Sequence, residues 1–478
     1  MSHSDNKIND VLITAWTKKG NGSGLDQKTG SKTVEVPFTA PGDLVQAELS
    51  RKRSGVYQAH LKEVITPSPL RQPAKCRHFG VCGGCRWQHI SYAEQLKIKE
   101  ETVKALFLPL LDLETQFYPI EPCVSPWQYR NKMEFSFSSD AKGERYLGLI
   151  MDSSGGKVLN LSECHLVNPW YIDVLTAVRD WWEDEELAAY HLSKNTGALR
   201  TLTVREGIRT GDRMVMLTVS GNPDFALKQA ELDSFVRTIQ KAMGTFAGNL
   251  SILLRIQQIA KGRETQFFEI LLLGKDQIEE KLLVQNDPTV PPKLFSFDVG
   301  PTSFFQPNTL QAERLYGLAI QHLNITQKDA VVYDLYCGTG TLGICVAGLA
   351  ARVIGIEIVP EAAIDARANA AKNGFPDIEI LTGAVDEVMR SEAFKLVPPP
   401  DIVMVDPPRV GLDPTTIAAL GALKPQKILY ISCNPVTQVQ NITALKPFGY
   451  RLEVVHPVDQ FPQTVHIENI AILSLMCP

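Results

Sequence analysis

The sequence has no long apolar run and no overall excess of basic residues. Its most apolar late stretch is interrupted by Arg352 and Glu357, well short of a membrane span. The opening residues, MSHSDNKIND, lack the apolar centre of a secretory leader. Nine cysteines in 478 residues are too few and too irregularly spaced for a secreted disulfide framework. We therefore expect a cytoplasmic protein with no membrane contact.

The composition excludes a disordered tail, a coiled coil and a lone small module. Apolar residues make up 44% of the chain and charged residues 21%, which is near the average for soluble globular domains. At roughly 150 residues per domain, this length corresponds to about three domains. We expect a small β-domain over residues 1–66, a middle region over 67–292 and a third domain over 293–478, in a monomeric protein.

The basic residues are concentrated in one part of the chain. The net charge of −5 argues against a nucleic-acid partner, yet residues 51–99 hold ten Lys or Arg and only two acids. This segment has a charge of +8, which leaves −13 for the rest. Tyr57, Phe79 and Trp87 are interleaved with its basic residues, a mixture typical of surfaces that neutralise phosphates and stack on unpaired bases. The alternative is a solvated basic face without a ligand.

Three cysteines are clustered in the segment CRHFGVCGGC, at Cys76, Cys82 and Cys85, and Cys164 in LSECHLV is a fourth candidate. The glycines between them let a short loop curl around an ion or a cluster, with several amides facing the thiolates. Four thiolates suit either zinc or a [4Fe-4S] cluster, and the spacing does not choose between them. The alternative is a chance cluster of buried structural cysteines.

The first 292 residues contain mostly short β-type runs. Four such runs within the first 66 residues predict a small barrel of the oligonucleotide-binding type, with the basic residues 51–53 at its edge. After a proline-rich linker, residues 91–107 predict an amphipathic helix, and we expect the longer segment 91–118 to pack on the C-terminal domain. From about 120 to 290, strand-like runs and one helical stretch predict an α+β region with an antiparallel sheet.

After residue 293, strands alternate with helices, which predicts an α/β domain with a parallel sheet. Its first strand leads into the turn DLYCGTGT at residues 334–341, where a helix N-terminus brings backbone amides close to a ligand. Glu357 ends the next strand, where a carboxylate can accept hydrogen bonds from both ribose hydroxyls of an adenosine. The turn is not G-x-G-x-x-G, so the pattern is typical of S-adenosylmethionine-dependent methyltransferases rather than of dinucleotide enzymes.

The fourth and fifth strands of this domain end in residues that select the chemistry. The fourth strand ends at Asp406-Pro407-Pro408-Arg409, so Asp406 is expected to face both the cofactor and the substrate base. A D-P-P motif also occurs in enzymes that methylate exocyclic amines, where an aromatic residue usually follows the prolines. The fifth strand places Cys433 at the same edge, before Asn434-Pro435. A thiol is needed when the acceptor is carbon 5 of a pyrimidine, which becomes nucleophilic only after a thiolate adds to carbon 6.

The segment DQFPQTVHIE near the C-terminus supplies a candidate base. His466 and Glu468 alternate on a strand-like segment and so point to one face. After methyl transfer, the proton on carbon 5 must be removed so that the thiolate is expelled, and a carboxylate in a dry pocket can take it. We predict Glu468 as the general base and His466 as a residue that positions it. The alternatives are an ordinary core cysteine at Cys433 and an ordinary ion-pair partner at Glu468.

Together these segments resemble the RNA uracil-5-methyltransferases, and within them the 23S ribosomal RNA branch that carries a TRAM domain and a [4Fe-4S] cluster. The resemblance covers nearly the whole chain through CRHFGVCGGC with Cys164, SFFQPN, DLYCGTG, GIE, DPPRVG, SCNP and FPQTVHIE. It implies that S-adenosylmethionine contacts Gln306, Tyr336, Glu357 and Asp406. It also implies Cys433 as the nucleophile, Glu468 as the base, and the cluster ligands Cys76, Cys82, Cys85 and Cys164.

The chain departs from the family pattern at three positions. Tyr336 stands where Phe is common, Ala384 where a polar residue often contacts the adenine, and Thr341 where some members carry Asn. None of these departures removes a catalytic group. The resemblance implies a C-terminal Rossmann-like methyltransferase domain that acts on a flipped or single-stranded uridine of 23S ribosomal RNA. The alternatives are a tRNA uridine-5 methyltransferase, a cytosine-5 or amine methyltransferase, and a non-catalytic RNA-binding or ribosome-assembly protein.

Overall fold

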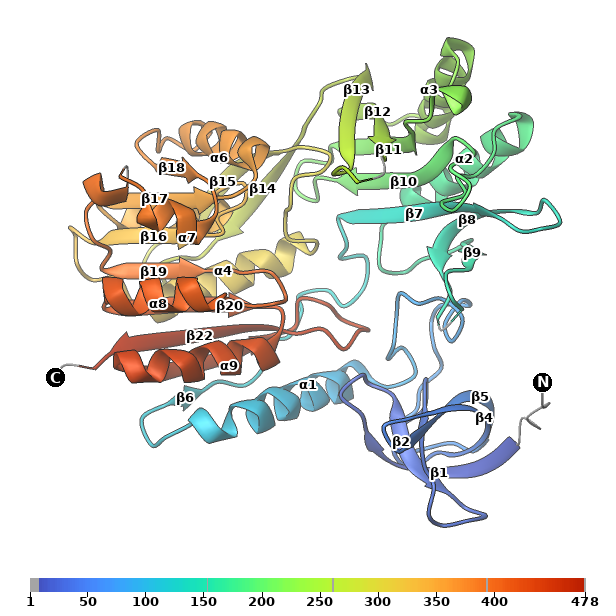
Figure 1. Ribbon diagram of the computed structural model, residues 1–478, viewed down its shortest axis with the longest axis horizontal. Helices are drawn as coiled ribbons and strands as arrows, with labels where there is room; N and C mark the ends of the chain where they lie inside the picture. Colours follow the sequence, from blue (N-terminus) through green and yellow to red (C-terminus); the bar gives the residue numbers. More distant parts are fainter. Residues whose placement is uncertain (1–7, 153, 260–261, 393, 477–478) are drawn as a thin grey trace.

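The computed structural model describes residues 8–152, 154–259, 262–392 and 394–476. Its strands form a closed barrel, a seven-stranded sheet, a two-stranded sheet and an eight-stranded sheet. The barrel and the seven-stranded sheet lie on the right of Figure 1, and the eight-stranded sheet with its helices lies on the left. In the described part of the chain, no helix is long and apolar enough to cross a membrane.

The N-terminal strands close into a barrel in the order β1-β2-β3-β5-β4. These strands are β1 (Ile8–Trp16), β2 (Gly22–Asp26), β3 (Thr33–Val36), β4 (Leu44–Arg53) and β5 (Val56–Thr66). Side chains alternate between the two faces of each strand, and the inward-facing valines, alanines and Ile13 form a small core of their own. The structure confirms the predicted small barrel, and its closed five-stranded form is consistent with an oligonucleotide-binding fold.

The middle region is built on the seven-stranded sheet, in the order β13-β12-β11-β10-β7-β8-β9. Its strands are β7 (Lys132–Ser139), β8 (Arg145–Ile150), β9 (Val158–Asn160), β10 (Leu199–Glu206), β11 (Arg213–Ser220), β12 (Leu250–Gln258) and β13 (Gln266–Leu273). The helical elements of this region are α2 (Trp170–Asp184), the short 3-10 helix η2 (Pro223–Phe225) and α3 (Gln229–Met243). Side chains of α2 and α3 share one apolar core with the sheet, and the rings of Trp181 and Phe235 meet there.

The expectation of an antiparallel sheet is wrong at one pair of strands, because β11 and β12 run parallel. A parallel neighbour requires a crossover connection, and α3, which was not predicted from the sequence, supplies it. Phe235, Ile239 and Met243 are spaced four residues apart on α3 and are buried against the sheet. The other neighbouring strands of this sheet pair in the antiparallel sense.

The C-terminal sheet has the strand order β18-β17-β16-β19-β20-β22-β21-β6. Its strands are β6 (Gln116–Phe117), β16 (Val331–Leu335), β17 (Arg352–Glu357), β18 (Glu379–Thr382), β19 (Ile402–Val405), β20 (Lys427–Ser432), β21 (Tyr450–Val458) and β22 (Glu468–Leu475). The five strands from β16 to β20 pair in parallel, which confirms the predicted α/β fold. The chain order reverses between β16 and β19, and such a switch point is where open α/β sheets bind their ligands.

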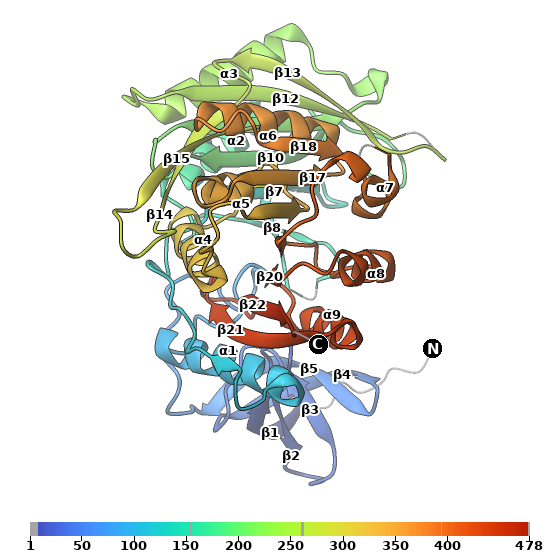
Figure 2. The same cartoon turned by 90° about the vertical axis from the view of Figure 1, so that its left-hand side faces the viewer.

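Helices cover both faces of this sheet, as Figure 2 shows. One face carries α4 (Thr309–Leu323), α5 (Thr341–Val346) and α6 (Pro360–Lys372), and the other carries α7 (Val385–Arg390), α8 (Pro414–Leu423) and α9 (Pro435–Leu445). Three short 3-10 helices complete this part: η3 (Ala347–Leu349), η4 (Phe394–Leu396) and η5 (Lys446–Phe448). Because both faces are covered, the parallel strands are almost continuously apolar and buried.

Helix α1 (Tyr92–Phe107) lies against α9 and β21. Ser91 caps its N-terminus by accepting a hydrogen bond from the Glu94 N–H. The helix does not continue through the whole segment 91–118, because Pro109 lies in the 3-10 helix η1 (Leu108–Leu110) that follows it. The chain then forms β6, which adds a parallel strand to the edge of the sheet at β21.

The hairpin of β14 (Ile278–Val284) and β15 (Lys293–Val299) straddles residue 292, where the sequence suggested a boundary. A two-stranded hairpin cannot bury its own apolar face. Ile278, Leu282 and Val284 instead share a core with α4 and with β16. The hairpin therefore packs with the C-terminal sheet and its helices.

Candidate active site

Four of the predicted site residues lie at one edge of the eight-stranded sheet. Tyr336 follows β16, Glu357 ends β17, Asp406 follows β19 and Cys433 follows β20. The carboxyl ends of parallel strands meet at a common edge, and these four strands flank the switch point. The fold thus places the four side chains where a ligand of an open α/β sheet binds.

The turn after β16 has a backbone that favours glycine. Gly338 and Gly340 have φ values of +55° and +79°, and Tyr336 also lies in the left-handed region at +65°. The Gly338 N–H donates to Glu357 Oε2 at 2.8 Å, and the Val359 N–H donates to Glu357 Oε1 at 2.8 Å. The turn and the carboxylate are therefore held together at the sheet edge.

Three carboxylates concentrate negative charge at this edge. Burial raises the pKa of Asp334 to about 7, and the charges of Asp406 and Glu357 add to the rise, although the Gly343 N–H donates to Asp334 Oδ2 at 2.8 Å. Burial also raises the pKa of Asp406 to about 7. A cationic ligand would offset this charge. The sulfonium and ammonium groups of S-adenosylmethionine are cations of that kind.

Gln306 lies in the loop between β15 and α4. It is buried, its Oε1 accepts a hydrogen bond from Gln460 Nε2 at 3.3 Å, and its side chain is hydrogen-bonded to Tyr316. Burial, and then the negative charge of Asp406, raises the pKa of Tyr316 well above its ordinary value. Gln306 is thus hydrogen-bonded to a tyrosine whose pKa responds to the charge of Asp406.

Cys433 and Glu468 flank the same end of a strand pair. β20 and β22 pair antiparallel with Ser432 opposite Asn469, so the next residues outward are Cys433 and Glu468. Glu468 is only 3% exposed, and its Oε2 has no hydrogen-bond partner among the described residues. Burial, and then Asp406, raises the pKa of Glu468 well above its ordinary value. A buried carboxylate with an unpartnered oxygen beside a thiol suits proton transfer.

Arg409 acts on both of these side chains. Burial and the nearby Glu468 raise the pKa of Cys433, whereas the charge of Arg409, within hydrogen-bond reach of the thiol, lowers it. Arg409 also lowers the pKa of Glu468. One of its guanidinium nitrogens lies 3.0 Å from His466 Nδ1, and burial lowers the pKa of His466 to about 4, so the neutral ring accepts this hydrogen bond. Arg409 was not predicted as a functional residue, and its place after Asp406-Pro407-Pro408 was the available signal.

The four predicted ligand cysteines lie together in the middle region. They line one cavity of about 120 Å³: Cys76, Cys82, Cys85 and Cys164. His78 Nε2 lies 3.0 Å from Ser162 Oγ, which fastens the loop of residues 76–85 to the segment that carries Cys164. Burial raises the pKa of Cys76 to about 11 and that of Cys85 to about 12, and neighbouring thiols add to both rises. Such a donor set is one that a bound cation stabilises as thiolates.

The arrangement of these thiols bears on the kind of group they fit. Within the described residues, no three Cys, His, Asp or Glu side chains are arranged to hold a single metal ion. A tetrahedral zinc site needs its sulfurs at about 2.3 Å from one ion. The four cysteines line one cavity together with other residues. The donor set itself suits either zinc or a [4Fe-4S] cluster.

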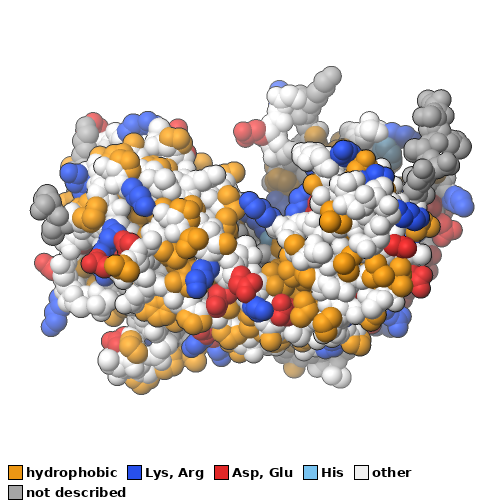
Figure 3. Space-filling model, turned by 90° about the horizontal axis from the view of Figure 1, so that it is seen from below, with side chains coloured by type: hydrophobic (Ala, Val, Ile, Leu, Met, Phe, Trp, Pro, Cys, Tyr) orange, Lys and Arg blue, Asp and Glu red, His pale blue; other side chains and the backbone are white. Residues whose placement is uncertain are grey.

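Acids of the same chain balance part of the charge of the basic segment 51–99. Five of its ten basic side chains are in ion pairs with acids: Lys62, Arg71, Arg77, Arg86 and Lys99. On the face drawn in Figure 3, Lys and Arg side chains are interspersed with Asp and Glu. An exposed basic cluster remains at residues 51–53, at the end of β4, where Lys52 Nζ lies 5.2 Å from the centre of the Tyr57 ring.

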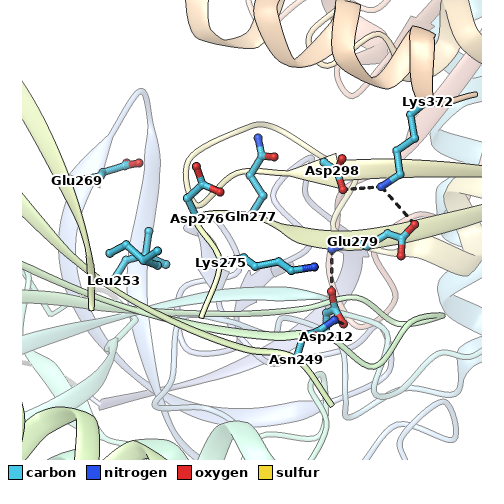
Figure 4. Close-up of a pocket in the computed structure, with 11 residues that line it drawn as sticks. Asp212, Asn249, Leu253, Glu269, Lys275, Asp276, Gln277, Glu279, Asp298 and Lys372 are labelled. Atoms are coloured by element: carbon cyan, nitrogen blue, oxygen red, sulfur yellow. Dashed lines mark hydrogen bonds and ion pairs between the residues drawn. The ribbon is translucent and has the colours of Figure 1, made fainter. Parts of the chain in front are cut away.

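A second cavity lies away from the sheet edge. It has a volume of about 730 Å³ and opens between the seven-stranded sheet and the β14–β15 hairpin (Figure 4). On one wall Lys372 Nζ lies 2.6 Å from Asp298 Oδ1 and 3.3 Å from Glu279 Oε1. None of the predicted site residues lines this cavity. Its size therefore does not mark the site of the chemistry.

The chain is similar to known RNA methyltransferases. The sequence profile described as "tRNA (Uracil-5-)-methyltransferase" matches residues 235–475. An uncharacterized RNA methyltransferase of Protochlamydia amoebophila is 50% identical over 92% of this chain and 100% of its own length. One of Chlamydia pneumoniae is 37% identical over 84% of this chain and 97% of its own length. The Pyrococcus abyssi tRNA (uracil-54, C5)-methyltransferase, solved in complex with S-adenosyl-L-homocysteine, covers 97% of this chain and 99% of its own, with 25% identity and a TM-score of 0.72.

Proposed function

The chain belongs to the tRNA (uracil-5-)-methyltransferase family and is an S-adenosylmethionine-dependent RNA (uracil-5-)-methyltransferase, and from this premise we propose that it methylates carbon 5 of a uridine in 23S ribosomal RNA. The observation that carries the proposed chemistry is the placement of Cys433 and Glu468 at the same end of the β20–β22 pair. A nucleophile and a base at one point serve an acceptor that must be activated covalently and then lose a proton. The proposed enzyme acts in the cytoplasm as a monomer.

The reaction follows from the two side chains. The thiolate of Cys433 adds to carbon 6 of the uracil, and the electron pair of the C5–C6 double bond becomes an enolate. Carbon 5 then attacks the methyl group, and the sulfur of the donor leaves with the bonding electrons. Glu468 removes the proton from carbon 5, the C5–C6 double bond re-forms, and Cys433 departs as a thiolate. Arg409 favours the thiolate at the start and again at the end.

Four residues form the proposed binding site for S-adenosylmethionine: Gln306, Tyr336, Glu357 and Asp406. Glu357 is already fixed by the amides of Gly338 and Val359, so its carboxylate is oriented before the ligand arrives. Asp406 follows β19, which lies between β16 and the strand that ends before Cys433. Its negative charge there would attract the positively charged methyl donor. The cofactor supplies an electrophilic methyl group, and these side chains orient it toward the base.

The cysteine cavity is proposed to hold a [4Fe-4S] cluster through Cys76, Cys82, Cys85 and Cys164. The support is the donor set itself: four partly buried cysteines that line one cavity. Such a cluster would tie the loop of residues 76–85 to the seven-stranded sheet near Leu149. No step of the methyl transfer needs an electron, so its proposed role is structural. Anaerobic protein that contains one zinc and no iron per chain would contradict this assignment.

The choice of 23S ribosomal RNA rests on the resemblance to the branch that carries both a barrel and a cysteine cluster. One observation favours tRNA as the second candidate. The Pyrococcus abyssi tRNA (uracil-54, C5)-methyltransferase aligns with 97% of this chain, barrel included, so the barrel by itself does not discriminate between the two substrates. The cysteine site is the feature on which the preference for ribosomal RNA depends.

The decisive experiment uses RNA labelled with tritium at carbon 5 of uridine and measures release of tritium to water with S-adenosylmethionine present. The substrates are 23S ribosomal RNA, assembling large ribosomal particles and bulk tRNA, and the proteins are wild type and Cys433→Ala. We expect wild type to release tritium from ribosomal RNA and Cys433→Ala to release none.

Each alternative has its own outcome when methyl transfer from methyl-labelled S-adenosylmethionine is measured beside tritium release. Release from tRNA alone would replace the proposed substrate by tRNA. Methyl transfer that survives in Cys433→Ala would indicate an amine acceptor, and transfer to cytidine but not to uridine would indicate a cytosine enzyme. A well-folded wild type that binds RNA but transfers no methyl group to any substrate would support the non-catalytic alternative.

A further inference from the structure

The loop between β21 and β22, residues 459–467, leads directly into Glu468 and carries His466. Loops are normally exposed, because water satisfies their backbone groups. This one is packed inside the protein, and its polar side chains are almost fully buried: Asp459, Gln460, Gln463 and Thr464. The loop must therefore find its hydrogen-bond partners within the chain, and they come largely from segments far away in the sequence.

Gln463 is the most constrained residue of the loop. Its φ of +68° lies in the left-handed region, which a residue other than glycine adopts only when its surroundings enforce it. Gln95 of α1 pairs with it twice: the Gln463 N–H donates to Gln95 Oε1 at 2.9 Å, and Gln95 Nε2 donates to Gln463 Oε1 at 3.0 Å. The Gln463 carbonyl accepts from the Arg86 N–H at 2.8 Å and from the Trp87 N–H at 3.2 Å. Four hydrogen bonds thus hold one strained residue.

Lys99 holds the start of the loop from one helical turn further along α1. Its side chain is fully buried, and its Nζ donates to Asp459 Oδ1 at 2.6 Å and to the Phe461 carbonyl at 3.1 Å. The hydroxyl of Tyr92, also on α1, donates to Asp459 Oδ2 at 2.8 Å. Both charges are buried, and both carboxylate oxygens of Asp459 are satisfied.

Packing alone does not explain why α1 buries Gln95 and Lys99. They lie four residues apart and so share one face of the helix, where leucines would bury more easily, because an ion pair loses much of its attraction to the cost of leaving water. Unlike leucines, these polar groups fix the position of the loop, because each forms hydrogen bonds to particular atoms of residues 459–467. The loop in turn sets where the chain enters β22, at Glu468.

We propose that Gln95 and Lys99 are positioning residues of the methyltransferase, which hold the 459–467 loop so that Glu468 faces the carbon 5 proton of the Cys433 adduct. The inference rests on the proposed function, because it assigns Gln95 and Lys99 to the proton-removal step. Arg86 and Trp87 directly follow Cys85, so the same set of bonds links the cysteine loop to the catalytic edge.

The proposal makes a kinetic distinction between two steps. Attack of Cys433 and methyl transfer do not need Glu468, whereas removal of the proton from carbon 5 and expulsion of the thiolate do. A displaced loop therefore slows the second step and leaves the rate of the first step unchanged. The covalent protein–RNA adduct, visible as a retarded band on a denaturing gel, accumulates while tritium release falls.

The test compares Lys99→Met/Asp459→Asn, which removes the ion pair without leaving a lone buried charge, with Gln95→Met, which acts on Gln463 independently. Lys104→Met is the matched control, since Lys104 is exposed on the same helix. For both test variants we expect tritium release to fall about tenfold, part of the 10²–10⁴-fold effect of general-base catalysis. The adduct fraction should rise several-fold, as in Glu468→Gln, with KM for RNA within about twofold of wild type.

The proposal is wrong if adduct formation and tritium release fall in the same proportion in both variants, because a purely structural role predicts that result. It is also wrong if neither quantity changes. A failure of the proposed function looks different, since the wild type itself would then release no tritium and form no adduct. If the double variant does not fold, Gln95→Met decides the question by the same ratio of adduct to product.

Discussion

At the residue scale, Arg409 is the cation whose charge acts on both Cys433 and Glu468. The thiolate is the reactive form of Cys433, so adduct formation rises as the pH passes the pKa of the thiol. Arg409 lowers that pKa, and its loss raises it. We therefore predict that Arg409→Gln moves the rise in the rate of adduct formation to higher pH by about one pH unit, as expected for the loss of one adjacent opposite charge.

The measurement is the pH dependence of single-turnover adduct formation with labelled S-adenosylmethionine. Arg409→Lys is the matched control: it retains the charge but not the planar hydrogen-bonding geometry, and it should show a smaller shift. A rate that falls equally at every pH, with an unmoved profile, would contradict the electrostatic role and indicate that Arg409 contacts the RNA instead.

The functional residues at strand ends could be predicted from the sequence, whereas the positioning residues on α1 could not. Cys433 and Glu468 stand out because an apolar strand ends beside a reactive group, and pyrimidine chemistry needs that pair of groups. Gln95 and Lys99 resemble the solvent side of an amphipathic helix, where such residues are normally found. Their burial depends on Asp459 and Gln463, more than 300 residues away, and no local pattern in the sequence reports such a partner.

At the element scale, the loop of residues 76–85 is joined to the seven-stranded sheet through the cysteine cavity. If the cavity holds a [4Fe-4S] cluster, removing one ligand should release the iron, from about four atoms per chain toward none. We predict this loss, with a lower thermal midpoint, for Cys164→Ser, because Cys164 is the one ligand that comes from outside the loop. Iron and acid-labile sulfide analysis of anaerobically purified protein, with thermal unfolding, measures both effects.

Cys345→Ala is the control for this experiment, because Cys345 is fully buried in α5 and lies in a different core. It should retain its iron while losing some stability to the small cavity that the substitution creates. Full iron content in Cys164→Ser, or no iron in the wild type, would contradict the assignment of the four cysteines as cluster ligands.

Helices and strands with a clear hydrophobic period could be predicted from the sequence. The pairing of the strands within the sheets was harder to predict. The barrel strands alternate buried and exposed residues, and the parallel strands from β16 to β20 are apolar runs between helices, so both sheets follow from local patterns. The parallel pair of β11 and β12 does not, because it depends on a crossover through α3. The end of α1 at Phe107 agrees with the predicted helix over 91–107, whereas the pairing of β6 with β21 was not predictable, because β21 lies at the far end of the sequence.

At the scale of the whole molecule, the protein combines a net charge of −5 with an RNA substrate. Half of the basic residues in segment 51–99 form ion pairs with acids of the same chain, so part of their charge is balanced within the protein. The basic end of β4 on the barrel, residues 51–53, is exposed. Because phosphate contacts dominate affinity and are screened by salt, this cluster should be visible in the salt dependence of binding.

We predict that neutralising Arg51, Lys52 and Arg53 together to Gln lowers the slope of log affinity against log salt concentration by about 2, since each lost contact to a single-stranded phosphate contributes about 0.7. The measurement is the Kd of a labelled RNA fragment at several salt concentrations. The control neutralises three exposed basic residues, Lys228 at the N-cap of α3 and Arg237 and Lys241 on it, and should leave the slope unchanged. An equal decrease in both variants would mean that only the overall charge of the protein matters. An unchanged slope in the barrel variant would mean that residues 51–53 do not contact RNA phosphates. RNA binding would then involve the middle region and the catalytic edge instead.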